Sequence, residues 1–322
     1  MPELPEVEVV RAGLAPAATD ARIESVTVFD ERSLRRHEGP AEDFVERLED
    51  RVMLTPERRG KFLWIPLAPA ASPAAAPAPE SREMVVPAAG TRPFDASEGD
   101  SEVLMVHLGM SGQVLLRDRA TDDRLTRIRL DVSHPTHGPL RLNFVDQRIF
   151  GSMAVDRLVA PADGLGGHVP SQVSHIARDP LDEHFDERRF LTRLAARRTG
   201  IKRALLDQTL ISGIGNIYAD EALWAARIHY DEPTDALSRP RAKRLLQEVR
   251  HVLTKALAEG GTSFDTQYLN VNGESGFFAH SLNAYGQQGK PCPRCSRQIV
   301  REQFMNRGSH FCAHCQRRRA AG

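Results

Sequence analysis

The pattern of hydrophobic and polar positions changes character about halfway along the chain. Short apolar runs of strand-like composition occupy residues 23–29, 52–54, 61–67, 103–108, 114–116, 127–132 and 140–144. From residue 186 onward, apolar positions recur at helical spacing, over residues 186–197, 201–210, 217–226 and 239–259. Because many short strands at modest spacing are typical of a sandwich or barrel, the pattern predicts an N-terminal β-sandwich followed by a helical domain. A short helix is expected over residues 6–14, before the first strand.

Two segments interrupt these elements. Residues 66–102 contain 7 Pro and 10 Ala, which predicts a flexible insertion between two paired strands. Residues 161–180 are rich in Gly and Pro and are interpreted as a linker. We therefore expect an α+β multidomain protein with an N-terminal domain over 1–160, a helical domain over 181–283 and a compact cysteine-containing module over 284–322.

The charge of the chain is unevenly distributed. Lys and Arg total 43, as do Asp and Glu, so the formal net charge is zero, which excludes a protein that is basic throughout. Residues 181–322 nevertheless carry 22 Lys and Arg against 15 Asp and Glu. This excess suggests a polyanionic partner, and an ordinary solvated surface is an equally weighted alternative.

The sequence also bears on location. No stretch reaches the roughly 20 apolar residues of a membrane span. The acidic first residues lack the apolar core of a secretory signal. We therefore expect an intracellular protein that does not bind membranes.

Four cysteines near the end of the chain form two CxxC pairs separated by sixteen residues. They are Cys292, Cys295, Cys312 and Cys315. This spacing matches a four-thiolate structural Zn²⁺ site, in which a closed ligand shell leaves no position for water. A pair of redox dithiols is the alternative, and the lack of a thioredoxin-like βαβ context disfavours it. The many arginines of residues 286–322 favour contact with phosphates.

Two further motifs carry candidate chemistry. Asn216 follows Gly213 and Gly215 and could cap the helix that begins at residue 217, whose free amides would bind a phosphate. If Met1 is removed, Pro2 becomes a secondary amine that can attack an aldehyde-like sugar carbon. Glu3 is adjacent and could move protons. From these residues alone, a proline-rich start of a helix is the favoured reading of the N-terminus.

These motifs together resemble the formamidopyrimidine-DNA glycosylase family over nearly the whole chain. The matching segments, in the family's order, are residues 2–8, 59–61, 107–112, 146–151, 206–221 and the four-cysteine finger. The resemblance implies an N-terminal β-sandwich with flanking helices, a helix–two-turn–helix domain with a lesion-capping loop and a C-terminal zinc finger, with DNA in the cleft between them.

The resemblance also implies an activity. It is that of a bifunctional DNA glycosylase and abasic-site lyase of base excision repair, which excises 8-oxoguanine and formamidopyrimidines through a Schiff base and cleaves the strand by β,δ-elimination. The expected partner is double-stranded DNA containing oxidised purines, and the expected cofactor is one structural Zn²⁺. A monomer is expected, in the bacterial cytoplasm and associated with the nucleoid through DNA.

The family's functional residues carry over by motif match. Pro2 would be the nucleophile, Glu3 the general acid and base, and Glu6 a supporting residue. Lys61 matches the lysine that handles oxidised purines.

The expected DNA contacts lie in several motifs. Met110 would fill the hole left by a flipped base, Arg148 would pair with the orphaned cytosine and Phe150 would wedge between bases. Four residues match phosphate-binding positions: His107, Lys202, Asn216 and Arg307.

The chain departs from the family pattern at several places. Ile149 stands where a second arginine is common, so a supporting contact is expected to be lost. Gln287 and Gln288 replace a commonly basic pair before the finger. Residues 271–277 match the mobile lid over the flipped base, without predictable individual contacts.

Two alternatives stand beside this interpretation. One is an endonuclease VIII-like glycosylase for oxidised pyrimidines, which Leu4 and Met110 disfavour. The other is a catalytically inactive DNA-binding homologue, which the presence of Pro2, Glu3 and Lys61 disfavours.

Overall fold

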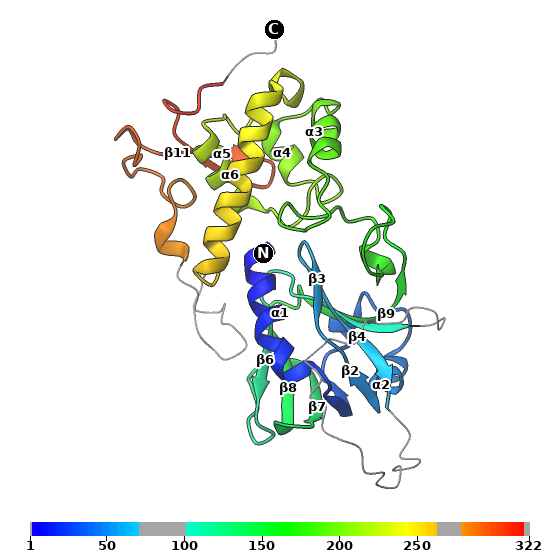
Figure 1. The fold of residues 1–322 in the computed structure, drawn as a ribbon. Helices are drawn as coiled ribbons and strands as arrows, with labels where there is room; N and C mark the ends of the chain where they lie inside the picture. Colours follow the sequence, from blue (N-terminus) through cyan, green and yellow to red (C-terminus); the bar gives the residue numbers. More distant parts are fainter. Residues whose placement is uncertain (1, 71–100, 263–277, 319–322) are drawn as a thin grey trace, which may run out of the picture.

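The described chain forms two domains that share a boundary (Figure 1). The computed structural model describes residues 2–70, 101–262 and 278–318. The N-terminal body is built mainly of strands and the second body mainly of helices, with the N-terminal end of the first helix between them. The central part of the predicted insertion, 71–100, and the predicted lid, 271–277, lie outside the described residues. No helix among the described residues is long and apolar enough to span a membrane.

A 10-stranded antiparallel sheet dominates the described N-terminal residues. Along its hydrogen-bonded path the order is β10-β9-β5-β4-β2-β1-β7-β8-β6, and β3 pairs with β4 off this path. The strands are β1 (Arg22–Val28), β2 (Arg51–Met53), β3 (Glu57–Arg59), β4 (Phe62–Pro69), β5 (Glu102–His107), β6 (Gly112–Arg117), β7 (Thr126–His134), β8 (Gly138–Asp146), β9 (Ser152–Val159) and β10 (Val169–Pro170).

The two halves of this sheet share one core, which confirms the predicted sandwich. Leu63 and Leu104 come from β4 and β5, Ile128 and Leu142 come from β7 and β8, and all four belong to the same buried cluster. Side chains alternate between the faces of a strand, so Trp64, next to Leu63, contributes to a different cluster on the outer face. Helices α1 (Leu4–Ala18) and α2 (Ala41–Leu48) also contribute to the shared core.

The segment predicted to be a linker is partly integrated into this domain. Within residues 161–180, β10 pairs with β9, and Val169, Val173 and Ile176 pack with Trp64 on the outer face of the sheet. These isolated apolar residues give no periodic signal, so the surrounding Gly and Pro dominated the sequence pattern.

The ends of the predicted insertion are also part of the sheet. Strand β4 extends to Pro69, and β5 begins at Glu102. Proline lacks an N–H donor, but the Pro66 carbonyl still accepts the Leu54 N–H at 2.8 Å.

The helical domain and the finger follow. The helices are α3 (Glu187–Ala195), α4 (Ile201–Leu205), α5 (Asn216–Ala226) and α6 (Arg239–Ala258), and the finger hairpin consists of β11 (Val300–Phe304) and β12 (Arg307–Phe311). Helix α4 is shorter than the predicted 201–210 because the backbone turns at Leu206 toward the glycine-rich segment.

The first helix belongs to both domains. Val7, Val10 and Leu14 pack in the core of the sandwich, whereas Leu4 is completely buried in the core of the helical domain. The Leu4 N–H also donates to the Gly213 carbonyl at 2.9 Å. Gly213 has a φ of +86°, and a Cβ there would lie 2.7 Å from the Leu4 side chain. The first residues of the chain therefore complete the core of a domain that lies far away in the sequence.

We expect Leu4→Ala to lower the free energy of unfolding by about 2–5 kcal/mol, because it leaves a cavity in the helical core. Denaturant unfolding followed by circular dichroism measures the loss. Val9→Ala is the control, since Val9 lies on the same helix and is only half-buried. An equal loss in both variants would contradict this role for Leu4.

Candidate active site and nucleic-acid interface

The carboxylate of Glu3 lies at the N-terminal end of helix α5. It is 2% exposed and accepts three backbone N–H groups, from Gly215 at 2.6 Å, Ile217 at 2.9 Å and Tyr218 at 3.3 Å. These are the amides that a helix leaves unpaired at its start, where the helix dipole favours a negative charge. The chain thus fills a potential phosphate-binding site with its own carboxylate.

This arrangement corrects the predicted role of Asn216 as a cap. Gly215 is the N-cap residue, and Asn216 is the first residue of the helix. A Cβ at Gly215 would lie 2.3 Å from the Glu3 side chain, so the glycine makes room for the carboxylate. The Asn216 side chain instead donates from Nδ2 to the Gly308 carbonyl in the finger hairpin at 3.2 Å.

Glu3 and Lys61 are both buried from solvent. Burial raises the pKa of the Glu3 carboxyl; the Lys61 ammonium opposes this shift, and the Glu6 carboxylate adds to it. Burial lowers the pKa of the Lys61 amine, against the attraction of Glu3 and Glu6. The two pKa values therefore move toward each other, which suits groups that exchange protons with a reacting molecule.

Glu6 ties the first helix to α5 and to Thr262, which follows the end of α6. Its Oε1 accepts the Tyr218 hydroxyl at 2.5 Å and both the N–H and the hydroxyl of Thr262 at 2.8 Å. Its Oε2 accepts the Glu3 N–H at 2.8 Å. The predicted supporting residue therefore fixes the backbone of Glu3, beside the buried Pro2. Neither Tyr218 nor Thr262 was predicted: Tyr218 lies in the matching segment 206–221 but was given no role, and Thr262 lies outside the matching segments.

A second group of predicted residues lies on two loops of the sandwich. Asp146 is completely buried, and its carboxylate accepts the Ser111 hydroxyl at 2.5 Å and the N–H groups of Arg148 at 3.0 Å and Gly151 at 2.6 Å. One carboxylate thus joins the loop that carries Met110 to the loop that carries Arg148.

Arg35 holds the second loop from its other side. Its guanidinium donates to the carbonyls of Ile149 and Gly151, both at 2.9 Å, and to that of Phe150. Ile149 has a φ of +56°, a left-handed conformation that is costly for a β-branched residue. Arg35 and Asp146 stabilise this conformation, and no sequence motif indicated the role of Arg35.

The two loops present apolar side chains to solvent. Met110 and Phe150 are each 44% exposed, and Arg148, on the same loop as Phe150, is also exposed. At Gly109 a Cβ would lie 2.2 Å from the Phe150 backbone, so the loops pack against each other directly. The structure therefore brings Met110, Arg148 and Phe150 together on two adjoining surface loops.

His107 lies beside these loops as a neutral side chain. Burial, followed by the charges of Arg36 and Arg35, lowers the pKa of His107 to about 4. Its Nδ1 accepts the Gly109 N–H at 3.1 Å, which leaves Nε2 to carry the proton. His107 can therefore donate a hydrogen bond to a phosphate, while Arg35 and Arg36 supply positive charge.

Lys202 differs from the prediction that it contacts phosphate. It is completely buried, its Nζ lies 2.6 Å from Asp220 Oδ1, and it donates to the Ser309 hydroxyl at 2.8 Å. Asp220 also accepts the His310 N–H at 2.8 Å. The Lys202 charge is therefore paired and enclosed, and the side chain does not form part of the exposed surface. Its contacts join the helical domain to the finger.

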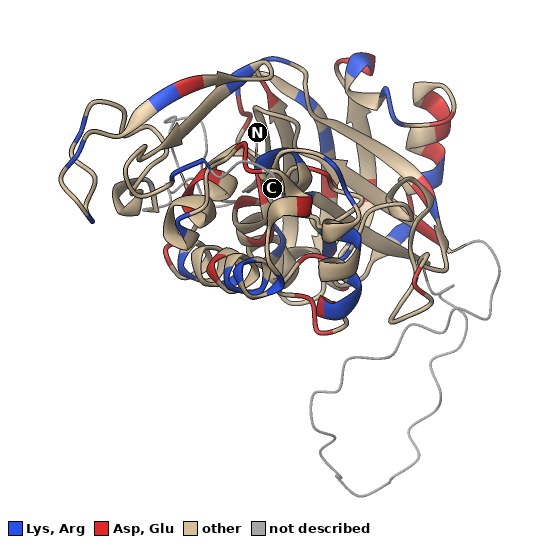
Figure 2. Ribbon diagram, turned by 90° about the horizontal axis from the view of Figure 1, so that it is seen from above, with Lys and Arg blue, Asp and Glu red and all other residues tan. Residues whose placement is uncertain are grey.

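Arg307 does lie where a polyanion could reach it. It is exposed in the finger hairpin, and its charge contributes to lowering the pKa of both Lys61 and Lys202. Figure 2 shows that Lys and Arg are spread over several elements and are not confined to one patch.

The four cysteines converge as predicted. Their sulfur atoms all lie within 4.8 Å of one another, and His314 is not part of the cluster. Tetrahedral zinc bonded to four thiolates would separate the sulfurs by about 3.8 Å, so the cluster fits such an ion. Trp224 of α5 donates from Nε1 to Cys292 Sγ at 3.4 Å, and Arg294 stacks over its ring at 4.1 Å. These contacts place the metal-binding site directly against the helical domain.

Comparisons with known proteins match all three parts of the chain. Residues 1–153 match the formamidopyrimidine-DNA glycosylase N-terminal domain, residues 176–268 the H2TH domain of these glycosylases, and residues 289–318 a zinc finger found in FPG and IleRS. The formamidopyrimidine-DNA glycosylase of Leifsonia xyli is 60% identical over 98% of this chain and 100% of its own length. That of Thermobifida fusca is 49% identical over 99% of this chain and 98% of its own.

Solved structures agree with these matches. The crystal structure of the MutM (Fpg) protein of Thermus thermophilus has a TM-score of 0.74 and 29% identity, covering 99% of this chain and 100% of that one. The Lactococcus lactis Fpg in complex with DNA containing an abasic site has a TM-score of 0.75 and 26% identity, covering 98% and 100%.

We expect Arg35→Gln to release the loop around Ile149 without unfolding the sandwich. Hydrogen bonds from a charged donor contribute about 1.5–3 kcal/mol, so backbone amides of residues 148–151 should exchange roughly tenfold to a hundredfold faster. Hydrogen exchange measured by mass spectrometry tests this. Arg32→Gln is the control, because Arg32 is exposed and pairs with Asp30 only. Equal exchange in the two variants would remove Arg35 from this role.

Proposed function

The chain belongs to the formamidopyrimidine-DNA glycosylase family, and from this premise we propose that it excises oxidised purines from double-stranded DNA and then cleaves the abasic strand. The proposed substrates are 8-oxoguanine and formamidopyrimidines. The strand cleavage is a β,δ-elimination that passes through a Schiff base on Pro2.

The observation that carries this proposal is the enclosure of the first residues between the two domains. Glu3 is fixed by the start of α5, Glu6 by Tyr218 and Thr262, and Lys61 is buried within the field of both carboxylates. An enclosed amine, carboxyl and ammonium are the groups that attack on a sugar carbon requires. A proline-rich start of an ordinary helix would not need this set of buried charges.

The proposed chemistry begins once removal of Met1 leaves Pro2 with a secondary amine. Its nitrogen forms a bond to C1′ of the damaged nucleotide, while the bond from C1′ to the base breaks and the base leaves with a proton. Glu3 protonates the ring oxygen as the sugar opens and an iminium forms. The iminium accepts electrons as a proton leaves C2′ and the 3′ phosphate departs. Elimination of the 5′ phosphate follows, and water releases Pro2.

The surface loops fit the DNA side of this reaction. A base must leave the duplex stack before its sugar can meet Pro2. Met110 and Phe150 are apolar and exposed on adjoining loops, so we propose that Met110 fills the vacated space and Phe150 wedges the neighbouring step. Arg148 would hydrogen-bond the orphaned cytosine. Ile149 provides no second guanidinium, and its left-handed backbone sets the directions of its neighbours.

Phosphate contacts and the metal complete the proposal. His107, Asn216 and Arg307 would contact backbone phosphates, and Lys202 would act indirectly by positioning the finger. The four cysteines would hold one Zn²⁺, which supplies a rigid structural crosslink and no chemistry at the sugar. We further propose that the protein acts as a monomer in the bacterial cytoplasm, associated with the nucleoid through DNA.

Borohydride trapping tests the nucleophile. We expect a covalent protein–DNA adduct on duplex containing 8-oxoguanine opposite cytosine, because borohydride reduces the iminium to a stable amine. Pro2→Gly should reduce the yield at least tenfold, and an N-terminal tag should abolish it. Gel electrophoresis of the labelled DNA measures the yield.

The matched control for this experiment is Pro5→Ala, because Pro5 lies in the same segment but in the first turn of α1. It should retain the adduct. An adduct that persists when the N-terminus is blocked would assign the chemistry to another amine, such as Lys61.

Metal removal tests the finger. A strong chelator should abolish DNA binding while the circular dichroism of the other domains is preserved, because the binding energy of a structural metal is folding energy for its site. Fluorescence anisotropy of a labelled duplex measures binding, and restored Zn²⁺ should recover it. Full binding by metal-free protein would show that the finger is not required.

A further inference from the structure

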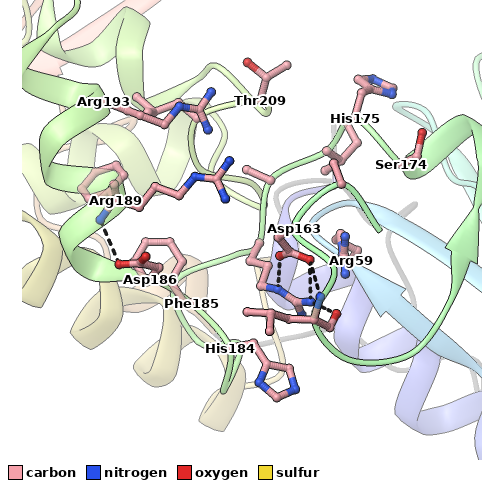
Figure 3. A pocket seen from close by; sticks show the side chains of 17 residues that line it. Arg59, Asp163, Ser174, His175, His184, Phe185, Asp186, Arg189, Arg193 and Thr209 are labelled. Carbon is pink, nitrogen blue, oxygen red and sulfur yellow. Dashed lines mark hydrogen bonds and ion pairs between the residues drawn. The ribbon is translucent and has the colours of Figure 1, made fainter. Parts of the chain in front are cut away.

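A cavity of about 470 Å³ lies between the two domains, beside the segment that connects them (Figure 3). Ala162, Asp163, Leu165 and residues 174–178 of that segment form part of its wall. Helix α3 contributes another part, and Arg59 at the end of β3 a third. This volume is in the range of small-molecule sites.

Three guanidinium groups line this cavity without a partner. In the part of the chain that the structure describes, the side chains of Arg59, Arg189 and Arg193 form no hydrogen bond or ion pair. Only the backbone N–H of Arg189 is engaged, with Asp186 at 2.9 Å. Arg59 is 6% exposed, so its charge is nearly removed from water. A guanidinium with so little access to water and no hydrogen-bond acceptor is costly, and an anion in the cavity would supply the acceptor.

The neighbouring side chains compensate the charge of Arg59 but do not give it a hydrogen bond. Arg178 lies 2.5 Å from Asp163 and 3.0 Å from Asp182, and it also donates to the Leu165 carbonyl. These contacts leave the two carboxylates engaged with Arg178. Arg178 and Arg59 together balance Asp163 and Asp182, which attract Arg59 without contacting it. The cavity wall as a whole still has an excess of positive charge, because Arg59, Arg178, Arg189 and Arg193 line it against the carboxylates of Asp163 and Asp186.

A second unpaired donor lies next to the first. Within the described residues, the indole Nε1 of Trp64 is buried and has no acceptor. Trp64 and Arg59 both line an adjoining cavity of about 420 Å³. A buried indole donor and the Arg59 guanidinium, neither with an acceptor among the described residues, thus flank the same boundary between domains.

We propose that this cavity binds a free phosphate-bearing anion of small-molecule size. Guanidinium groups bind phosphate oxygens through two parallel hydrogen bonds, so Arg59, Arg189 and Arg193 suit such a ligand. Phe185 and Phe190, which also line the cavity, offer an apolar surface to an organic part of the molecule.

The site is distinct from the catalytic residues. Arg59 and Lys61 flank Gly60 in the turn between β3 and β4, but they have different charged neighbours. Lys61 interacts with Glu3 and Glu6, whereas Arg59 interacts with Arg178 and the carboxylates around it. The cavity is not lined by Pro2, Glu3, Glu6 or Lys61, which favours a free anion over the DNA backbone. A bound anion would link β3 of the sandwich to α3 of the helical domain and so stabilise one relative placement of the two.

Pyrophosphate is the probe for this site. In full-length protein we expect saturable binding by isothermal titration calorimetry and a higher thermal midpoint. The double variant Arg189→Gln, Arg193→Gln should bind at least tenfold more weakly. Arg188→Gln is the matched control, because Arg188 is exposed on the same helix but does not line the cavity, and it should bind as the unaltered protein does.

Two further measurements make the proposal falsifiable. Arg59→Met should also weaken pyrophosphate binding at least tenfold, and its circular dichroism spectrum checks that it folds. Unchanged affinity in either the double variant or Arg59→Met would overturn the site. If the double variant also loses affinity for undamaged duplex DNA at least tenfold and pyrophosphate competes with that DNA, the arginines contact the DNA backbone and the free-anion assignment is wrong.

Discussion

The buried carboxylate of Glu3 at the start of α5 is the interaction on which the rest of the structure depends. It satisfies amides that belong to the helical domain, while Glu3 itself caps the start of a helix that packs on the sandwich. Both the geometry of the candidate catalytic residues and the relation of the two domains follow from it. Gly215 and Gly213 are required because the N-terminal segment approaches the backbone there too closely for a side chain. The burial that makes this contact strong also raises the pKa of Glu3 and lowers that of Lys61. The burial of Glu3 therefore both attaches the N-terminal segment to the helical domain and shifts the pKa values of Glu3 and Lys61.

The finger is attached through a comparable arrangement. Consecutive acidic residues on α5 accept from two different parts of the C-terminal chain. Asp220 accepts from the hairpin at His310, and Glu221 accepts the N–H groups of Ala284 and Tyr285, each at 2.8 Å. Helix α5 thus contacts the N-terminal segment at its start and the finger along its length, and it carries Trp224 against the cysteine cluster. A single helix of 11 residues thus connects the N-terminal segment, the helical domain and the finger, all of which a bound duplex would have to contact.

The sequence predicted what depends on local pattern and left out what depends on distant partners. The sandwich and the helices were predicted because burial of one face imposes a period on the chain, and the cysteine site because metal ligation imposes a spacing. The motifs also located the Glu3 segment and the Met110 and Phe150 loops. Lys202 was misread as a phosphate contact because the same residue type serves a buried ion pair once Asp220 lies beside it. Arg35 carried no signal, since its partners are carbonyls more than a hundred residues away. The domain boundaries at 160, 180 and 283 stay predictions.

The position of Leu4 has a consequence for how the protein is made. Synthesis is vectorial, and N-terminal domains generally fold first as the chain leaves the ribosome. The sandwich can form its own core early, but Leu4 has no binding site until the helical domain has emerged, and Glu3 has none until α5 exists. Under the proposed chemistry, a nascent or prematurely terminated chain would therefore hold Pro2 in solvent, without the carboxylate and ammonium environment that would activate it. Activity would then arise only when translation is nearly complete, and unfinished chains would not react with DNA sugars.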